Sequence, residues 1–187
     1  MRMKVRRIYT MQDRYGIDQY VRSIPDFPEK GIIFRDITSV IQSPEGLKKS
    51  IDGMIESLKG VDFDIVLGPE SRGFIFGMPV AYALGKGFVP VRKKGKLPCE
   101  TIEIEYELEY GTAVVEMHKD AIKPGDKVVI VDDLIATGGT IEAIIKMVES
   151  LGGEVVKVQF LMELAGLKGR EKLSKYDVDS LLIYDGK

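Results

Sequence analysis

The sequence predicts an α/β fold in which helices cover both faces of a mostly parallel, twisted sheet. Short apolar runs alternate with amphipathic helical stretches along the chain, and glycine-rich loops separate them. Strand–helix–strand alternation is typical of parallel sheets with helices on both faces. A chain of 187 residues without repeats, low-complexity tracts or linkers fits one domain with a substantial core. We therefore predict a single domain over residues 1–187.

Three helices are indicated by caps and by apolar stripes at helical spacing. Ser43 and Pro44 suit the N-cap and the first turn of the first helix. The second helix follows a glycine-rich loop and ends near Leu84, and the third ends at Gly152 and Gly153. The stripes of the first and third helices are Leu47, Ile51, Met54, Ile55, Leu58 and Ile141, Ile144, Ile145, Val148, Leu151.

Short strands are predicted between these helices. Residues 103–109 and 113–117 alternate as in a solvent-facing hairpin. Because parallel sheets bind ligands beyond the C-terminal ends of their strands, the loops after Leu67, Val91 and Val131 should line one crevice. The other predicted strands cover residues 65–67, 88–91, 127–131, 155–161 and 180–184.

Charge and composition exclude several classes of protein. The net charge is −2, so the chain has no overall attraction to nucleic acid or to anionic membranes. No apolar run is long enough to span a bilayer, and the basic residues 1–9 lack the apolar stretch of a secretory signal. Cys99 is the single cysteine, which indicates a reducing, cytoplasmic location. Small anionic ligands remain candidate partners, because positive charge is concentrated at residues 92–96.

The segment 128–140 carries the strongest functional signal. An apolar strand delivers two adjacent carboxylates, Asp132 and Asp133, to the expected edge of the sheet. A loop of small residues then opens a helix, and its backbone N–H groups can hold a phosphate. Carboxylates suit sugar hydroxyls or a magnesium ion. The predicted phosphate-binding residues are Ala136, Thr137, Gly138, Gly139 and Thr140.

A tight turn with Thr140 as a plain N-cap is the alternative interpretation of this loop. The Gly-Lys-Ser/Thr of the usual ATP loop is absent, so the phosphate would belong to another ligand.

The segment 128–140 resembles the phosphoribosyl pyrophosphate signature of the type I phosphoribosyltransferases. The resemblance implies their fold, with a small N-terminal hood formed by about residues 1–40. It implies that the loop 136–140 holds the 5′-phosphate and that Asp132 and Asp133 lie near the ribose hydroxyls. Magnesium would then bridge those hydroxyls and the pyrophosphate.

Residues 27–38 are similar to the hood segment of the adenine-specific members of that family. The resemblance implies that Phe34 stacks on the purine and that the backbone of Ile33 and Arg35 reads the purine edge. Taken alone, an Ile-Ile-Phe run more often lies in a core, so a core position for Phe34 is the alternative.

Residues 68–74 resemble the pyrophosphate loop of the same family. Arginine offers a planar fork that matches phosphate oxygens, and the resemblance makes Arg72 a catalytic pyrophosphate ligand. It also implies a strained or cis peptide between Glu70 and Ser71. A surface salt bridge is the alternative for Arg72.

Residues 92–98 resemble the basic segment of the family. The resemblance implies that Lys93 faces the pyrophosphate, that Lys94 reaches the site of the partner subunit in a homodimer, and that Lys96 belongs to the same donor site. A run of lysines is also typical of a solvated face, which is the alternative.

Residues 108–111 match the flexible catalytic loop of the family, in a mobile segment that includes residues 95–105. The resemblance implies that the Glu109 carboxyl exchanges a proton with the purine near N7. The match extends over residues 17–172, and residues 1–15 resemble an extra or variable arm.

Together these resemblances imply a magnesium-dependent enzyme of purine salvage that transfers the phosphoribosyl group from phosphoribosyl pyrophosphate to adenine, giving AMP and pyrophosphate. Another purine such as xanthine or hypoxanthine is the first alternative, although xanthine-type relatives carry Asn-Gly where Thr137-Gly138 stands. The second is a non-catalytic sensor of phosphoribosyl pyrophosphate. The retained Glu109 and the net charge of −2 favour catalysis over such a nucleic-acid-binding regulator.

Overall fold

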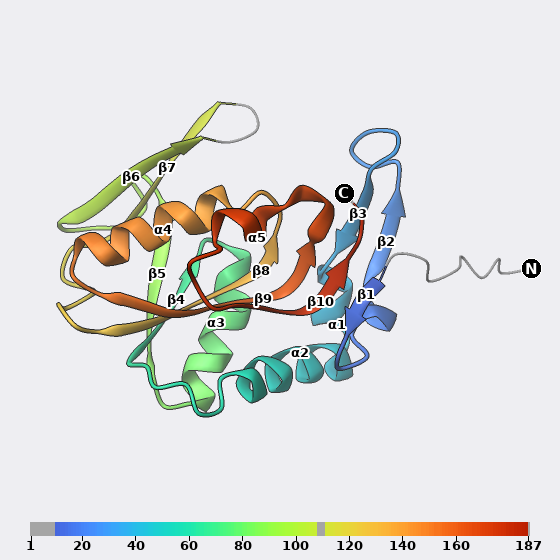
Figure 1. Ribbon diagram of the computed structural model, residues 1–187, viewed down its shortest axis with the longest axis horizontal. Coiled ribbons are helices and arrows are strands. Elements are labelled where there is room, and N and C mark those ends of the chain that lie inside the picture. Colours follow the sequence, from blue (N-terminus) through green and yellow to red (C-terminus); the bar gives the residue numbers. More distant parts are fainter. Residues whose placement is uncertain (1–9, 108–110, 187) are drawn as a thin grey trace, which may run out of the picture.

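An eight-stranded sheet forms the centre of the protein (Figure 1). The computed structural model describes residues 10–107 and 111–186. The strand order is β1-β10-β9-β8-β4-β5-β7-β6, in which β10, β9, β8, β4 and β5 run parallel and the outer strands run antiparallel. The strands are β1 (Thr10–Asp13), β4 (Ile65–Pro69), β5 (Gly87–Lys93), β6 (Thr101–Glu107), β7 (Thr112–His118), β8 (Lys127–Ile135), β9 (Glu154–Leu164) and β10 (Val178–Tyr184).

Helices cover both faces of this sheet, as predicted (Figure 1). One face carries α4 and α5, and the opposite face carries α2 and α3. The helices are α1 (Thr38–Gln42), α2 (Pro44–Ser57), α3 (Arg72–Ala83), α4 (Gly139–Ser150) and α5 (Gly169–Lys172), with short 3₁₀ turns at η1 (Asp18–Tyr20) and η2 (Ala165–Leu167). No helix in the described ranges is long and apolar enough to cross a membrane.

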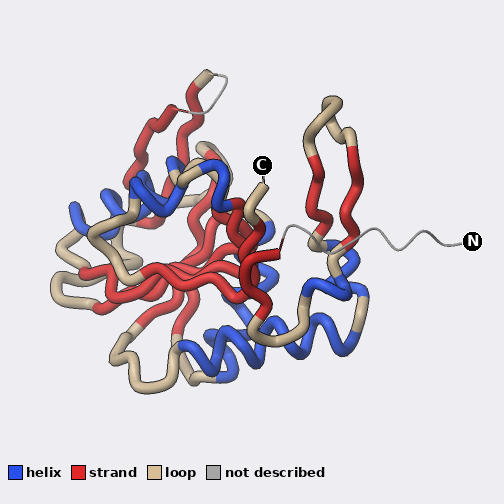
Figure 2. The backbone as a smooth tube through the Cα atoms, turned by 45° about the vertical axis from the view of Figure 1, so that its right-hand side comes forward, coloured by secondary structure: helices blue, strands red, loops and turns tan. Residues whose placement is uncertain are grey.

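A separate two-stranded sheet stands beside the main one. It is the antiparallel hairpin of β2 (Arg22–Pro25) and β3 (Ile33–Asp36), which form hydrogen bonds with each other and not with the eight-stranded sheet. Figure 2 shows this hairpin projecting away from the body of the molecule. It contains the residues expected to form the hood.

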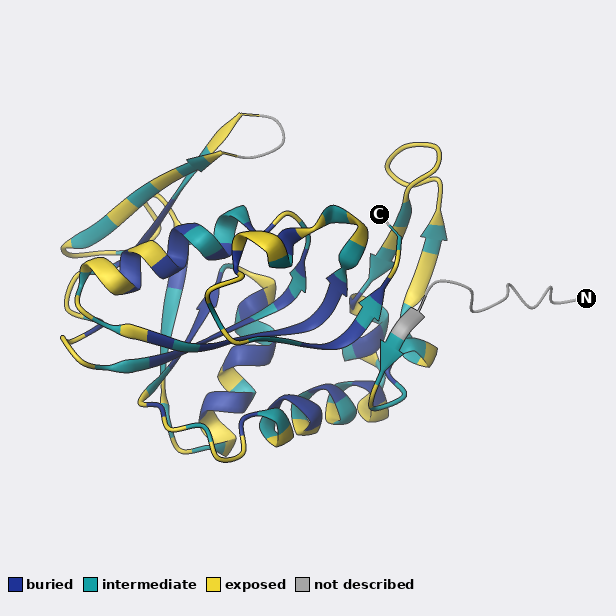
Figure 3. Ribbon diagram, in the orientation of Figure 1, coloured by how far each residue is buried: buried dark blue, intermediate teal, exposed yellow. Residues whose placement is uncertain are grey.

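The predicted start of α2 is confirmed. Ser43 is the N-cap, and its Oγ accepts a hydrogen bond of 3.1 Å from the backbone N–H of Gly46. Pro44 occupies the first turn, where its missing N–H costs nothing. The helix then buries one face and exposes the other, as Figure 3 shows for each of the long helices.

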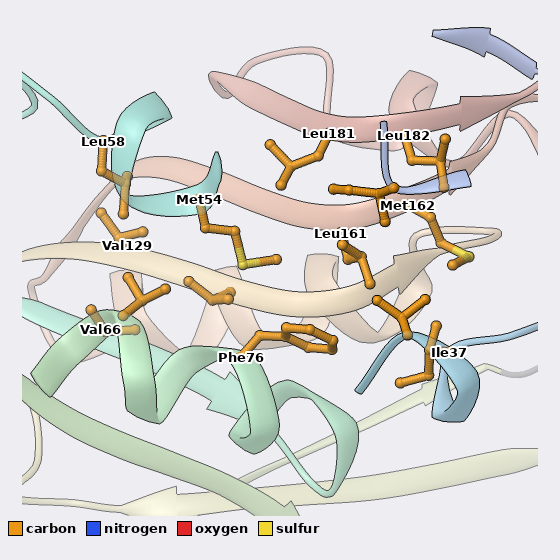
Figure 4. Close-up of a cluster of buried hydrophobic side chains, with 14 of the residues drawn as sticks. Ile37, Met54, Leu58, Val66, Phe76, Val129, Leu161, Met162, Leu181 and Leu182 are labelled. Carbon is orange, nitrogen blue, oxygen red and sulfur yellow. The ribbon is translucent and has the colours of Figure 1, made fainter. Parts of the chain in front are cut away.

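The core consists of two clusters, one on each face of the sheet, and β8 contributes to both. Val129 and Val131 belong to the cluster under α2 and α3, which Figure 4 shows in close-up. Val128 and Ile130 belong to the cluster under α4. Because successive side chains of a strand point to opposite faces, an apolar run of this kind is what a doubly covered central strand requires.

The predicted end of β8 is wrong. The strand was expected to stop at Val131, but it continues to Ile135, so Asp132 and Asp133 lie inside it. The reason is its neighbour: β9 also runs further than expected, and the parallel pairing continues through Asp132↔Phe160 and Ile135↔Glu163. Two polar residues do not end a strand while its partner strand still offers hydrogen bonds.

Two outer strands also differ from the expectation. The hairpin of β6 and β7 was expected to face solvent, yet β7 is buried at residues 115–117, because it lies between β5 and β6. The arm at residues 1–15 contains β1, which pairs with β10 and closes the other edge of the sheet.

We expect Met54→Ala to reduce the free energy of unfolding by about 2–5 kcal/mol. Met54 is fully buried between α2 and the sheet, so truncation leaves a cavity in the first cluster. Denaturant unfolding measures the loss. Glu56→Ala on the exposed face of the same helix is the matched control, expected to change stability by about 0.5 kcal/mol or less. Equal effects of both variants would contradict this account of the core.

Candidate active site

The loop between β8 and α4 borders a cavity of about 450 Å³ at the edge of the sheet. The chain enters α4 at Gly138, whose φ of +79° lies in the left-handed region. A side chain there would also meet the carbonyl oxygen of Gly169, 2.7 Å from the ideal Cβ position. The first turn of α4 lines the cavity, so the positive end of a 12-residue helix lies beside it. All of the predicted phosphate-loop residues, 136–140, line this cavity.

Asp132 and Asp133 line the same cavity. Asp133 is 3% exposed, and its buried Oδ2 is the oxygen that forms an ion pair with Arg72. Removal from water, and after it the charge of Asp133, raise the pKa of Asp132 well above its ordinary value. Its Oδ1 accepts a 2.8 Å hydrogen bond from the Asp133 backbone N–H, which acts in the opposite direction. The two carboxyl groups therefore repel each other when both are charged, and a cation or hydroxyl donors bound between them would relieve that repulsion.

Arg72 lines the same cavity and contacts Asp133 from the start of α3. Its Nε is 2.7 Å from Asp133 Oδ2, and about half of its side chain is exposed. The preceding Glu70–Ser71 peptide is cis, as the resemblance implied. The alternative interpretation of Arg72 was a salt bridge on the surface. Arg72 does form a salt bridge, but both of its partners line the cavity.

A second cavity, of about 400 Å³, adjoins the first, and Arg72 and Asp133 line both. Its lining residues on the hood side are Ile32, Ile33, Phe34, Arg35, Asp36, Ile37 and Thr38, and those on the sheet side are Leu134, Leu164 and Leu167. Most of these side chains are apolar. Such a lining suits a flat organic ring, with the backbone of the hood available for hydrogen bonds.

Phe34 lies in the wall of this second cavity and not in the core. Its side chain is 37% exposed, and the hairpin carries it away from both buried clusters. Phe27 meets it edge-on, with ring centroids 5.3 Å apart and ring planes at 79°. The core position considered for Phe34 is therefore wrong.

The structure does not bring the predicted lysines to either cavity. Lys93, Lys94 and Lys96 are exposed and absent from both linings. Lys94 Nζ lies 2.7 Å from Glu103 Oε2 on the β6–β7 hairpin, and this hydrogen bond raises the pKa of Lys94. In this structure the three lysines lie on a solvent-exposed face, which was the alternative interpretation of the lysine run.

The turn after β5 is hydrogen-bonded to Glu116, a carboxylate of β7 that is 2% exposed. Its Oε1 accepts 2.7 Å hydrogen bonds from the backbone N–H groups of Lys96 and Leu97. Burial alone would raise the pKa of Glu116, but these bonds outweigh it and hold the pKa below its ordinary value. The path of the turn is thus set by a buried anion.

Glu109, the predicted acid and base, lies outside the described residues. Three residues before it, Tyr106 lines the first cavity, and Thr140 Oγ1 donates a 3.2 Å hydrogen bond to its hydroxyl. The β6–β7 hairpin is therefore hydrogen-bonded to the loop 136–140 through this pair of side chains.

Comparison with known proteins decides the family. The model of the phosphoribosyl transferase domain matches residues 39–186. The chain is 71% identical over 171 residues to the adenine phosphoribosyltransferase of Lachnoclostridium phytofermentans, covering 91% of this chain and 98% of that protein. The chain belongs to the phosphoribosyltransferase family.

Solved structures of adenine phosphoribosyltransferases have the same fold. That of Thermoanaerobacter pseudethanolicus has a TM-score of 0.85 and 57% identity, covering 89% of this chain and 96% of that one. That of Saccharomyces cerevisiae, solved with adenine and an imino-altritol bisphosphate, has a TM-score of 0.82 and 44% identity, covering 88% and 96%.

Several residues of this phosphoribosyltransferase site were not predicted. Tyr106 could have been found, because the alternation of β6 places it on the same face as Ile104. Glu116 was also detectable, as a lone charge in an apolar run. Leu164 and Leu167 carry no such signal, since only the fold brings the end of β9 to the hood.

We expect Gly169→Ala to weaken phosphoribosyl pyrophosphate binding by about tenfold. A Cβ on Gly169 would overlap the carbonyl oxygen of Ala136, so the phosphate loop must shift. Isothermal titration measures the affinity. Gly87→Ala is the control, because Gly87 has nothing within 4 Å of its ideal Cβ position. An unchanged affinity in the Gly169 variant would show that the loop tolerates the displacement.

Proposed function

We propose that the protein transfers the 5-phosphoribosyl group from phosphoribosyl pyrophosphate to adenine, forming AMP and pyrophosphate in purine salvage. One observation carries the proposal: two adjoining cavities of opposite chemistry share Arg72 and Asp133. The first offers a phosphate loop and carboxylates, and the second is apolar and roofed by the hood. A donor and a base held in them would meet at the shared wall. The yeast relative was solved with adenine, which supports adenine as the base.

The donor binds in the first cavity. Backbone N–H groups of residues 136–140 and the hydroxyls of Thr137 and Thr140 hold the 5′-phosphate. Asp132 and Asp133 accept hydrogen bonds from the ribose hydroxyls. Arg72 then exchanges its contact with Asp133 for the pyrophosphate oxygens, which its guanidinium fork matches. The ion pair supports this step because it already holds the Arg72 side chain in the cavity.

Magnesium is the cofactor of this proposal. The donor set fits a hard cation, because the carboxylates of Asp132 and Asp133 line one cavity, and Asp133 Oδ2 has only the Arg72 ion pair to give up among the described contacts. The described ranges hold no cluster of three or more potential metal ligands, so the substrate must supply most of the coordinating oxygens, with Asp132 and Asp133 nearby. When bound, magnesium neutralises charge on the leaving pyrophosphate.

The base binds in the second cavity. Phe34 stacks on the purine, and the backbone of Ile33 and Arg35 reads its edge. The purine N9 attacks C1 of the ribose as the pyrophosphate leaves. Glu109 exchanges a proton with the purine near N7 as charge shifts. Most of the rate then comes from positioning and charge stabilisation.

The basic segment completes the donor site in a homodimer. Lys93 and Lys96 approach the pyrophosphate of their own subunit, and Lys94 approaches that of the partner. These side chains must move from their present positions, and the Glu103 contact of Lys94 is exposed enough to break at little cost. The dimer works in the cytoplasm, and each chain forms one domain over residues 1–187 with its hood within residues 1–40.

We expect magnesium-dependent release of pyrophosphate with adenine and not with hypoxanthine, guanine, xanthine or orotate. The reason is that the hood backbone offers one set of donors and acceptors to the base, so a base with a different set leaves polar groups unpaired. A parallel assay of the five bases at one concentration measures this, with chelated magnesium as the control. Activity with another base would contradict the adenine assignment, and donor binding without turnover on any base would favour the sensor alternative.

We expect Glu109→Leu and Asp132→Asn/Asp133→Asn to fail in different ways. The first should lower kcat by about 10²- to 10⁴-fold, because it removes a proton-transfer group, with little change in donor affinity. The second should weaken donor binding in magnesium by about tenfold or more, because it removes charge-assisted contacts. Steady-state kinetics and titration with the donor separate the two effects.

Glu105→Leu is the matched control for Glu109→Leu. Glu105 is an exposed carboxylate on β6, and its replacement should leave kcat near that of the parent. Normal turnover in the Glu109 variant would contradict its role in proton transfer, and unchanged donor affinity in the aspartate variant would place the ribose elsewhere.

A further inference from the structure

The hood hairpin has no strand partner in the body of the protein. Its strands pair only with each other, from Arg22↔Asp36 to Pro25↔Ile33. The cavity of about 400 Å³ separates it from Leu134, Leu164 and Leu167. Figure 2 shows the hairpin standing clear of the main sheet. Its base is fixed to the body by the buried Ile37 and by the hydrogen bonds of Ser39 to Tyr20 and Arg22, so above that base only side chains can set its distance from the sheet.

Arg35 is the side chain that makes this connection. It lies on β3, and its guanidinium carbon is 4.0 Å from the centroid of the Tyr184 ring on β10. A guanidinium at this distance from an aromatic ring is held by a cation–π interaction, which is strongest where water is excluded. Its Nη1 also donates a hydrogen bond to Ser23 Oγ on β2. The guanidinium is thus held by both the hood and the main sheet.

Tyr184 is a rigid platform for this contact. Its side chain is 1% exposed, and its strand lies between β1 and β9. Its hydroxyl donates a 2.8 Å hydrogen bond to Asp18 Oδ1. The backbone N–H groups of Ile17 and Asp18 in turn donate to Asp13, at 2.8 and 3.1 Å. The tyrosine is therefore fixed by its strand and by the segment that follows β1.

We propose that Arg35 is a positioning residue whose side chain, stacked on Tyr184, sets the height of the hood above the base cavity. This inference rests on the proposed function, in which the backbone of Ile33 and Arg35 reads the purine edge. Hydrogen-bond recognition fails with displacements of about 1 Å, so the anchor governs base affinity. The donor cavity is formed by the main sheet, α3 and α4, and does not depend on the hood's height.

A direct contact between the Arg35 guanidinium and a substrate phosphate is the competing interpretation. Arg35 does not line the first cavity, and its contacts with Tyr184 and Ser23 direct the guanidinium to the main sheet and to β2. A positioning role therefore predicts a change in the KM for adenine with the KM for the donor preserved.

The test compares Arg35→Met, Arg35→Lys and Tyr184→Phe with a matched control on the same hairpin. Arg22→Met is that control, because the Arg22 side chain is 62% exposed and its ion pair among the described residues is a long one with Asp36, at 3.8 Å. We expect the KM for adenine to rise by about 3- to 30-fold in Arg35→Met and less in Arg35→Lys, which keeps the cation. Tyr184→Phe keeps the ring and should have the smallest effect of the three. The KM for phosphoribosyl pyrophosphate should stay within about twofold throughout.

Amide hydrogen exchange of residues 22–25 and 33–36 gives a second readout that needs no catalysis. These amides should exchange faster in Arg35→Met than in the parent and in Arg22→Met. Unchanged exchange overturns the inference, and so does an unchanged KM for adenine or an equal rise in both KM values. If the parent itself shows no activity with adenine, the proposed function fails, whereas the exchange experiment still decides whether Arg35 anchors the hairpin.

Discussion

The central strand β8 has to satisfy two demands that oppose each other. It must be apolar on both faces, because α2 and α3 cover one side of the sheet and α4 covers the other. It must also place Asp132 and Asp133 at the edge where ligands bind. The conflict is resolved by continuous pairing with β9, which satisfies the backbone of β8 through the polar residues to Ile135. Negative charge thus lies on a rigid strand rather than on a loop.

Close backbone contacts then hold the rest of the donor site against this strand. Gly73 lets α3 approach, since a Cβ there would lie 2.7 Å from Pro69 Cδ and 3.0 Å from the Val131 carbonyl oxygen. Gly138 and Gly169 let the phosphate loop and α5 meet in the same way. These contacts leave no room for methyl groups, so the loop 136–140 has few ways to move.

Much of this site could be predicted from the sequence because its signals are local. Asp132 and Asp133, the loop that follows them and Arg72 belong to short segments in which residue type and order carry the chemistry, and the structure brings them to one cavity. The lysines of residues 93–96 were less predictable. The Lys94 side chain is held by Glu103, and the backbone of Lys96 is held by Glu116. Both carboxylates come from other strands of the sheet.

The same limit applies to the hood. The sequence resemblance pointed to Phe34 and its neighbours, which line the second cavity, but the contact between Arg35 and Tyr184 joins opposite ends of the chain and has no local signature. The length of β8 was misjudged for a related reason, because a strand ends where its partner ends, and the partner is distant in sequence. Tertiary pairing overrides local pattern in both cases.

The two halves of the site are therefore built with different rigidity. The donor half consists of strand ends, glycine contacts and a helix N-terminus, all within the packed sheet. The acceptor half is shared between that sheet and a hairpin that forms no hydrogen-bonded ladder with it. A base bound under the hairpin contacts the hairpin on one side and the sheet on the other, so selecting it requires the hairpin to stay at one height. The stacking of Arg35 on the buried Tyr184 meets this requirement, since it fixes the distance between the hairpin and the main sheet without adding backbone hydrogen bonds between them.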